Sequence, residues 1–261
     1  MIDMNQITEE LLQNKPHLAE PIRFYDKTRK FTGIVQELLN ALPADSCRRE
    51  LNAYPTASVS TIVRQFTAVF ELPEGSLSPL LQALELGEID FMRLPLRETP
   101  AFSLPYAEED LQLILFLISR PYFLGLRDSR GLGGRHWDKG KCPICGAQPS
   151  LSSIANNGSR RLFCPFCGTE GEGARTGCPV CLNSDPSKVN ILTFEGEPGF
   201  KVHACGECAS YVKTAEHEML SRFTPELIEL ISLPLDFVAQ EKGYARRSPN
   251  PIGIMNMVVR G

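Results

Sequence analysis

The sequence predicts an α+β fold in which an N-terminal all-helical domain is followed by two small cysteine-rich units and a short helical tail. Apolar residues recur at helical spacing in the first half, cysteines cluster as Cys-x-x-Cys pairs in the second, and short alternating runs separate these pairs. The predicted segments are 1–126 (helical domain), 127–141 (glycine-rich basic linker), 142–172 (first cysteine-rich unit), 173–213 (second cysteine-rich unit) and 214–261 (helical tail).

Composition indicates a soluble, cytoplasmic protein. Of the 261 residues, 43% are apolar, which is enough to bury a core, and the net charge of −4 gives no overall attraction to nucleic acid or to anionic membranes. The nine cysteines are odd in number and clustered, and the first residues lack the basic and apolar regions of a secretory leader. We therefore expect reduced thiols rather than disulfides. No apolar run reaches membrane-spanning length.

The first half reads as a helical scaffold. Helices are expected over residues 21–42, 58–72 and 77–87, the last capped by Ser76, and from about residue 106 onward. The stretch from Leu111 to Ile118 is apolar almost all round, which predicts the central helix of this domain. Nothing in this half resembles a catalytic group: His17 is expected to be a surface histidine, and Cys47 a half-buried free thiol.

The linker RDSRGLGGRHWDKGK, residues 127–141, interrupts the helical pattern with four glycines and an excess of positive charge. One interpretation is a solvated linker. The other is a basic contact surface with His136 and Trp137 as anchors, because tryptophan and arginine are favoured at interface hot spots. The sequence leaves both interpretations open.

Eight of the nine cysteines form four Cys-x-x-Cys pairs. The pairs are Cys142/Cys145, Cys164/Cys167, Cys178/Cys181 and Cys205/Cys208. Such a turn places two sulfurs where both reach one metal ion, so two turns supply a tetrahedral site. All eight cysteines are therefore predicted to be metal ligands, in two four-thiolate sites.

Hairpin signals between the pairs predict how the ligands are grouped. The runs SLSSI and RRLFC flank an Asn-Gly turn, and the alternating runs KVNILTF and FKVHAC flank EGEPG. A hairpin returns its second strand beside its first. Each unit therefore consists of a Cys-x-x-Cys turn, here called a knuckle, then a hairpin, then a second knuckle. Of these eight cysteines, the first four should then share one ion and the last four the other, in preference to interleaved schemes.

The knuckle sequences fit rubredoxin-like or zinc-ribbon units, with zinc or iron as the metal. Cys-Pro-x-Cys-Gly, at 142–146 and 164–168, occurs in rubredoxin-type iron sites and in structural zinc ribbons. A four-sulfur shell leaves no position for a substrate, so metal-dependent hydrolysis is disfavoured and no enzyme activity is expected. A cubane cluster is disfavoured because closely spaced cysteine triples are missing.

Two other classes with Cys-x-x-Cys motifs fit less well. A nucleic-acid-binding ribbon needs a basic face, but lysine and arginine balance aspartate and glutamate six to six over residues 142–213. A thioredoxin-like oxidoreductase needs one such motif at a helix start in a βαβ pattern, which is missing here. His203 is expected to be an exposed strand residue rather than a ligand.

In the tail, Thr224 and Pro225 predict the start of one helix and Pro234 the start of another. The stretch GYARRSPNPIG is expected to be irregular. Arg246 and Arg247 are not followed by the apolar run of an export signal.

The stretches CPICGAQP, RRLFCPFCGTE, CPVC and ACGECASYVKT, in this order, resemble the formate dehydrogenase accessory protein family FdhE. The resemblance extends to PIRFY in the first half, to Pro121 and to PLDFVAQEKGYARRSPNPIG, and it is most specific from Lys141 to Lys213. The chain departs from the family pattern at Gly171, where an aromatic residue is usual, and at Leu182, where glycine is usual.

This resemblance implies a cytoplasmic, non-catalytic maturation factor that associates with the catalytic subunit of formate dehydrogenase before export and carries two rubredoxin-like metal centres. The residues themselves agree in offering two closed thiolate sites and no catalytic constellation, but they do not identify the partner. The alternative is a rubredoxin-like electron-transfer protein that uses mononuclear iron. A homodimer is left open.

Overall fold

The computed structural model describes residues 4–41, 56–89, 104–130, 135–137, 140–155 and 157–258. The chain divides into two compact units: Arg23–Leu126 forms the helical unit, and Met1–Ile22 together with Arg127–Gly261 forms the sheet unit. The predicted order of a helical region, a cysteine-bearing sheet region and a helical tail is confirmed. In the structure, residues 1–22 group with the sheet; the five segment boundaries given above stay a prediction.

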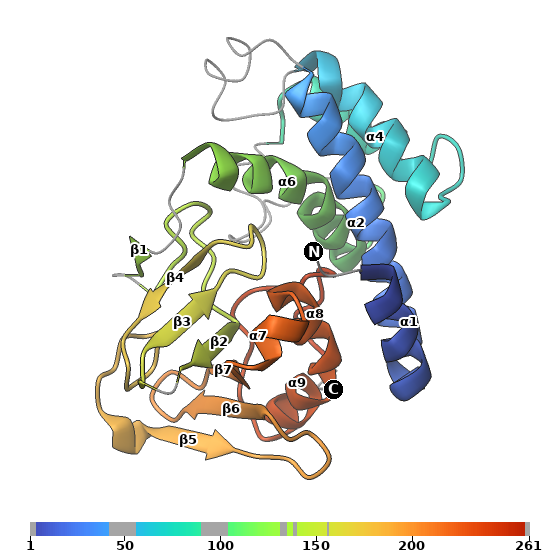
Figure 1. The fold of residues 1–261 in the computed structure, drawn as a ribbon. Helices are drawn as coiled ribbons and strands as arrows, with labels where there is room; N and C mark the ends of the chain where they lie inside the picture. The colour runs from blue at the N-terminus through green and yellow to red at the C-terminus, as the bar shows by residue number, and fades with distance from the viewer. Residues whose placement is uncertain are drawn as a thin grey trace. The chain divides into compact units, whose positions relative to one another are not determined.

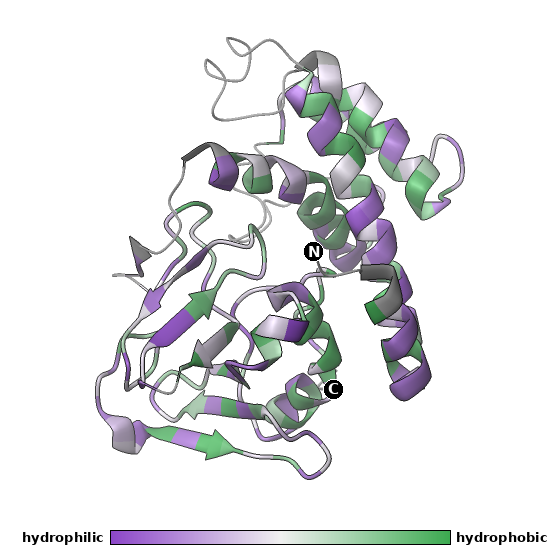
Figure 2. Cartoon of the chain, in the orientation of Figure 1, coloured by the Kyte–Doolittle hydropathy of each residue, from purple (hydrophilic) through white to green (hydrophobic). Residues whose placement is uncertain are grey.

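The helices of the first half form where the apolar stripes predict them. They are α2 (Ala19–Asn40), α4 (Thr56–Phe70), α5 (Ser78–Glu85) and α6 (Glu108–Arg130), preceded by α1 (Met4–Asn14) and the 3-10 turn η1 (Pro16–Leu18). Green and purple residues alternate along α2 and α4, as expected of helices with one buried side (Figure 2). No described helix is both long and apolar enough to cross a membrane.

Aromatic side chains form the centre of the helical unit. The ring of Phe31 in α2 packs edge to face against that of Phe66 in α4, with ring centroids 5.2 Å apart. Phe66 also stacks on Phe70, with ring centroids 4.4 Å apart. Two predicted details are wrong. Ser76 is not the cap of α5, which begins two residues later, after Leu77, with no side-chain cap. Helix α6 begins at Glu108 rather than at about residue 106, and it continues to Arg130.

A seven-stranded sheet, in the order β1-β4-β3-β2-β7-β6-β5, forms the other unit (Figure 1). The strands are β1 (Arg135–His136), β2 (Leu151–Ile154), β3 (Arg160–Phe163), β4 (Glu170–Gly173), β5 (Val189–Leu192), β6 (Phe200–Cys205) and β7 (Tyr211–Glu216). The predicted hairpins are β2/β3 and β5/β6. Each gains a third antiparallel strand, β4 or β7, and parallel pairing of β2 with β7 joins the two halves.

Three helices lie beside this sheet: α7 (Met219–Arg222), α8 (Pro225–Ile231) and α9 (Leu233–Glu241), coloured orange to red in Figure 1. The expected start of α8 is observed, because the Thr224 hydroxyl accepts a hydrogen bond from the Leu227 amide at 3.4 Å. The side of the sheet that carries Lys213 faces α8 and α9, since Lys213 contacts residues of both helices.

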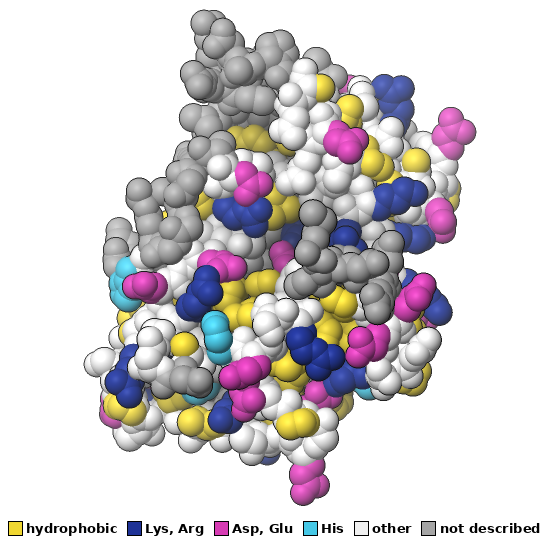
Figure 3. Space-filling view, viewed as in Figure 1, with side chains coloured by type: hydrophobic (Ala, Val, Ile, Leu, Met, Phe, Trp, Pro, Cys, Tyr) yellow, Lys and Arg dark blue, Asp and Glu magenta, His cyan; other side chains and the backbone are white. Residues whose placement is uncertain are grey.

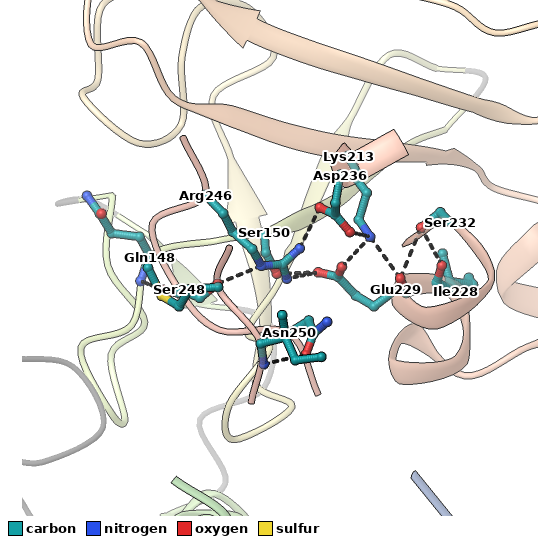
Figure 4. A network of polar contacts seen from close by, with 12 residues as sticks. Gln148, Ser150, Lys213, Ile228, Glu229, Ser232, Asp236, Arg246, Ser248 and Asn250 are labelled. Carbon is teal, nitrogen blue, oxygen red and sulfur yellow. Dashed lines mark hydrogen bonds and ion pairs between the residues drawn. The ribbon is translucent and has the colours of Figure 1, made fainter. Parts of the chain in front are cut away.

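Four buried charged side chains connect helices α8 and α9 to the sheet (Figure 4). Lys213 Nζ lies 2.6 Å from Asp236 Oδ2 and 2.8 Å from Glu229 Oε2. Arg246 of the tail bridges the same two carboxylates, at 2.8 and 3.0 Å. All four side chains are at most 2% exposed. Since two cations face two anions, the network is neutral, which makes burial of its members tolerable.

The network also fixes the protonation of its carboxylates. Burial alone raises the pKa of Glu229, but the charges of Arg246 and Lys213 outweigh this and lower that pKa to about 2. Burial, followed by the charge of Asp236, raises the pKa of Tyr211, whose hydroxyl donates to Asp236 Oδ1 at 2.7 Å. Glu229 is therefore a carboxylate at neutral pH.

Replacing Glu229 by glutamine leaves Lys213 and Arg246 with one carboxylate between them. We expect E229Q to lower the free energy of unfolding at pH 7 by about 3–5 kcal/mol, as when a buried ion pair loses one member. Because the Glu229 pKa is lowered on folding, the difference from wild type should be complete above about pH 4.5 and shrink as the pH falls toward 2.

Denaturant titration at several pH values measures this difference. E241Q, which changes an exposed glutamate at the end of α9, is the matched control and should unfold like wild type. An E229Q variant as stable as E241Q at pH 7 would contradict the role of the network.

Candidate metal centres

Each Cys-x-x-Cys pair lies on a tight turn with a recurring set of backbone hydrogen bonds. In the first turn the Gly146 amide donates to the Cys142 carbonyl at 2.9 Å, and the Cys142 amide to the Ala147 carbonyl at 2.7 Å. The residue after the second cysteine has a positive φ in all four turns: Gly146 (77°), Gly168 (65°), Leu182 (64°) and Ala209 (52°). Glycine at positions 146 and 168 is thus explained by backbone geometry, because glycine adopts a positive φ without strain.

The cysteines form two clusters, and these have the predicted grouping. The first cluster is Cys142, Cys145, Cys164 and Cys167; the second cluster is Cys178, Cys181, Cys205 and Cys208. Within each cluster all four sulfurs lie within 4.8 Å of one another. The hairpins β2/β3 and β5/β6 bring the knuckles together, as the order of elements along the chain required.

The sulfur spacing fits a tetrahedral ion. Four sulfurs at 2.3 Å from a zinc ion are about 3.8 Å apart. In the second cluster Cys178 Sγ lies 3.8 Å from Cys208 Sγ, and Cys181 Sγ 3.8 Å from Cys205 Sγ. The corresponding pairs in the first cluster are 3.5 and 3.4 Å apart. These separations exceed the disulfide bond length of about 2.05 Å, so each cluster could hold one metal ion.

The two clusters differ in exposure. In the first cluster three cysteines are buried and Cys145 is half-buried, whereas in the second cluster Cys181 is exposed and Cys208 half-buried. The second cluster lies on a small apolar group that includes Val180 and Val212. It therefore has one edge in solvent and one against the sheet.

Backbone amides donate hydrogen bonds to two of the cluster sulfurs. The Cys167 amide donates to Cys164 Sγ, and the Val180 amide to Cys178 Sγ, both at 3.4 Å. Burial raises the pKa of Cys164, whereas in Cys208 the hydroxyl and amide of Ser210 help outweigh burial and lower the pKa to about 7. Because every ligand must be a thiolate, an ion would bind with release of protons.

The C-terminal tail holds the fourth knuckle. The Ala245 amide donates to the Ala209 carbonyl at 2.7 Å, and Arg247 donates to the Cys208 carbonyl at 2.7 Å and to the Ser210 hydroxyl at 2.5 Å. These contacts support the positive φ of Ala209. This role of the tail was not predicted, since GYARRSPNPIG was expected to be an irregular end. The resemblance of that stretch to the FdhE family was the available signal.

The remaining candidate residues fall outside the clusters. His17 is exposed, as expected. His203 is half-buried rather than exposed, and its Nδ1 lies 2.6 Å from Thr214 Oγ1, which accounts for it without a metal. Cys47 lies outside the described residues.

Two pieces of the predicted linker contribute to the sheet unit. Arg135 and His136 form strand β1, parallel to β4. Trp137 is 3% exposed, so it is not an exposed anchor for a partner. On the face shown in Figure 3, lysine and arginine are interspersed with aspartate and glutamate.

Comparison with known proteins confirms the resemblance stated above. Residues 178–252 match the family model described as FdhE, C-terminal domain. The chain is 30% identical over 150 residues to a protein named "Protein FdhE homolog" from Aquifex aeolicus, covering 55% of this chain and 53% of that protein. It is 36% identical over 118 residues to the homolog from Stutzerimonas stutzeri, covering 43% and 38%. The chain thus spans about half, or less, of the length of these relatives.

The fold is that of a solved structure, the FdhE protein from Pseudomonas aeruginosa. The TM-score is 0.55 with 22% identity, and the likeness covers 94% of this chain and 93% of that chain. At this identity the likeness establishes the fold alone.

Gly177, just before the third knuckle, is predicted to be indispensable for the second cluster. It has a φ of 82°, and a Cβ there would overlap the Asn183 carbonyl oxygen, which accepts the Cys178 amide at 2.8 Å. Gly196 is a matched control, since it has the same φ but no atom within 4 Å of a Cβ. We expect G196A to cost about 1–2 kcal/mol from the backbone alone, and G177A to cost clearly more.

Melting curves and metal content of the two variants measure this difference. Loss of one ion per chain in G177A, with both ions retained in G196A, is the expected result. Equal behaviour of the two variants would show that the close approach at Asn183 is unimportant.

Proposed function

We propose that the chain is a cytoplasmic accessory factor that binds the catalytic subunit of formate dehydrogenase and is needed for its maturation into active enzyme. The observation that carries this proposal is the pair of closed four-cysteine clusters, built into a sheet and resembling FdhE proteins in sequence. A full sulfur shell leaves no coordination position for a substrate. This supports a binding role over metal-dependent catalysis.

The eight cysteines are proposed as the ligands of two ions, zinc or iron. Residues 142, 145, 164 and 167 would hold one ion, and residues 178, 181, 205 and 208 the other. An ion supplies the cross-link that joins two knuckles; hairpins of this size bury too little apolar surface to fold alone. The metal thereby fixes the surface of the sheet, and that surface is what a client protein would contact.

The alternative is electron transfer through mononuclear iron in rubredoxin-like sites. The exposure of Cys181 favours it, because an edge of the second cluster reaches solvent, where a redox partner could approach. Purification without oxygen, followed by a visible spectrum, separates the two functions. A red, reversibly reducible protein supports electron transfer, and a colourless protein with two zinc ions per chain excludes it.

Removal of the metal is predicted to unfold the cysteine-rich sheet. A structural four-cysteine zinc site is worth roughly 10–16 kcal/mol of apparent binding free energy at neutral pH, which is comparable to the stability of a whole domain. Chelation, C145S or C181S should therefore lower the metal content and the melting temperature and cause aggregation. C47S is the control, because Cys47 belongs to no Cys-x-x-Cys pair. Full metal content and unchanged melting of C145S would refute its assignment as a ligand.

Client binding is tested by retention of the catalytic subunit from a formate-respiring lysate. Wild-type protein and C47S should retain the subunit, whereas C145S and C181S should not, because each disrupts one half of the sheet. Failure of correctly metallated wild-type protein to retain the subunit would refute the proposed function. Retention by every variant would show that the clusters do not form the binding surface.

A further inference from the structure

Arg160, the first residue of β3, is a buried cation that lacks an acidic partner. Its side chain is 3% exposed. Nη1 donates to the Gly177 carbonyl at 3.2 Å and Nη2 to the Ser152 hydroxyl at 3.3 Å, while Nε has no partner among the described residues. In the described part of the chain, no carboxylate forms an ion pair with it. A buried charge is costly unless it is paired.

The contrast with the other buried cations of the sheet unit is sharp. Lys213 and Arg246 each contact two carboxylates (Figure 4). Alternation along a strand directs Thr214 to the opposite side of the sheet from Lys213. Thr214 lies 2.8 Å from Ser152, so Arg160 belongs to this second side and not to the carboxylate network.

The side chains that hydrogen bonds link to Arg160 are neutral. A chain of hydrogen bonds runs from Ser152 through Thr214 to His203. Ser152 Oγ lies 2.8 Å from Thr214 Oγ1, which lies 2.6 Å from His203 Nδ1. Burial, followed by the charges of Arg160 and Lys201, lowers the pKa of His203 to about 4, so the imidazole is neutral at pH 7. None of these groups supplies negative charge.

The second cluster would supply a negative charge once it holds an ion. Arg160 is anchored to the carbonyl of Gly177, the residue before Cys178. Burial lowers the pKa of Arg160 to about 10, and a negative charge on Cys178 would act in the opposite direction. A divalent ion bound by four thiolates carries a surplus of two negative charges, which is the compensation that a buried guanidinium requires.

We propose that Arg160 is the counter-charge of the second metal centre, so that a strand of the first cysteine-rich unit sets the metal affinity of the second. This inference rests on the proposal that Cys178, Cys181, Cys205 and Cys208 bind an ion. Arg160 is then a positioning residue, because it makes no hydrogen bond to a ligand sulfur. Its positive charge stabilises the anionic metal centre, and its hydrogen bond to the Gly177 carbonyl positions the third knuckle. Arg160 thereby links the two cysteine-rich units, since β3 leads directly into Cys164 of the first cluster.

The test is chelator competition on cadmium-loaded protein, followed by cadmium NMR, in which each centre gives its own resonance. In wild type, the resonance of the second centre is the one whose cadmium couples to the β-protons of Cys178, Cys181, Cys205 and Cys208. R160M removes the charge and keeps an apolar side chain, R160Q keeps a donor without charge, and R160K keeps the charge while changing the donor geometry. R161M is the matched control, because Arg161 is 47% exposed, pairs with Glu170 and points to the other side of the sheet.

We expect R160M and R160Q to lose the second cadmium at an EDTA concentration at least about tenfold below that for wild type, as when one partner of a desolvated charge pair is removed. The first resonance should persist, and R160K and R161M should behave like wild type. Unchanged affinity in R160Q overturns the proposal, and so does simultaneous loss of both resonances, which indicates a purely structural role. If neither neutral variant folds, R160K decides: wild-type affinity supports the proposal and a tenfold loss overturns it.

The wild-type spectrum separates this inference from the metal assignment. Two resonances establish two centres, and the variants then test Arg160 alone. A single resonance, coupled only to the cysteines of the first cluster, refutes the second centre itself and with it the role of Arg160.

Discussion

The structure depends on one constraint: four sulfur atoms from two distant turns must meet around a point. A knuckle can present both sulfurs inward only if the chain reverses immediately after the second cysteine, which is why all four following residues have a positive φ. Glycine satisfies this twice, but Leu182 and Ala209 do so at a cost of about 1–2 kcal/mol each. An ion bound at each cluster would offset that cost many times over. The strained positions both belong to the second cluster, which is also the more exposed one.

Buried charge is handled differently on the two sides of the sheet. Towards α8 and α9, two cations and two carboxylates compensate one another within the protein itself. On the other side, Arg160 is paired only if the second cluster carries negative charge. The first arrangement is independent of any ligand, whereas the second makes part of the fold conditional on one. Such a division lets a protein keep its helical face intact while the cysteine face responds to metal supply.

Local sequence signals predicted the parts of the fold that local chemistry determines. The apolar stripes predicted α2, α4 and α6 to within a few residues, and the Asn-Gly turn and alternating runs predicted both hairpins and hence both clusters. Strand β4 was missed because its sequence, EGEG, has a low propensity for strands. Gly173 is required there by packing, since a Cβ would lie 2.8 Å from Leu162 Cδ1. Burial of Lys213 and Arg246 was missed because their partners lie on other elements.

The parallel pairing of β2 with β7 places a demand on the order of events during synthesis. Ser152 and Thr214, adjacent in this pairing, are 62 residues apart in the chain. At 5–20 residues per second, the ribosome needs about 3–12 s to make that stretch. Throughout this interval the nascent β2/β3 hairpin presents an unpaired strand edge, the kind of surface at which chains aggregate. Ser152 and Ser153 place small polar side chains on that edge. The newborn chain is therefore most vulnerable to aggregation after the β2/β3 hairpin has formed and before strand β7 has been synthesised.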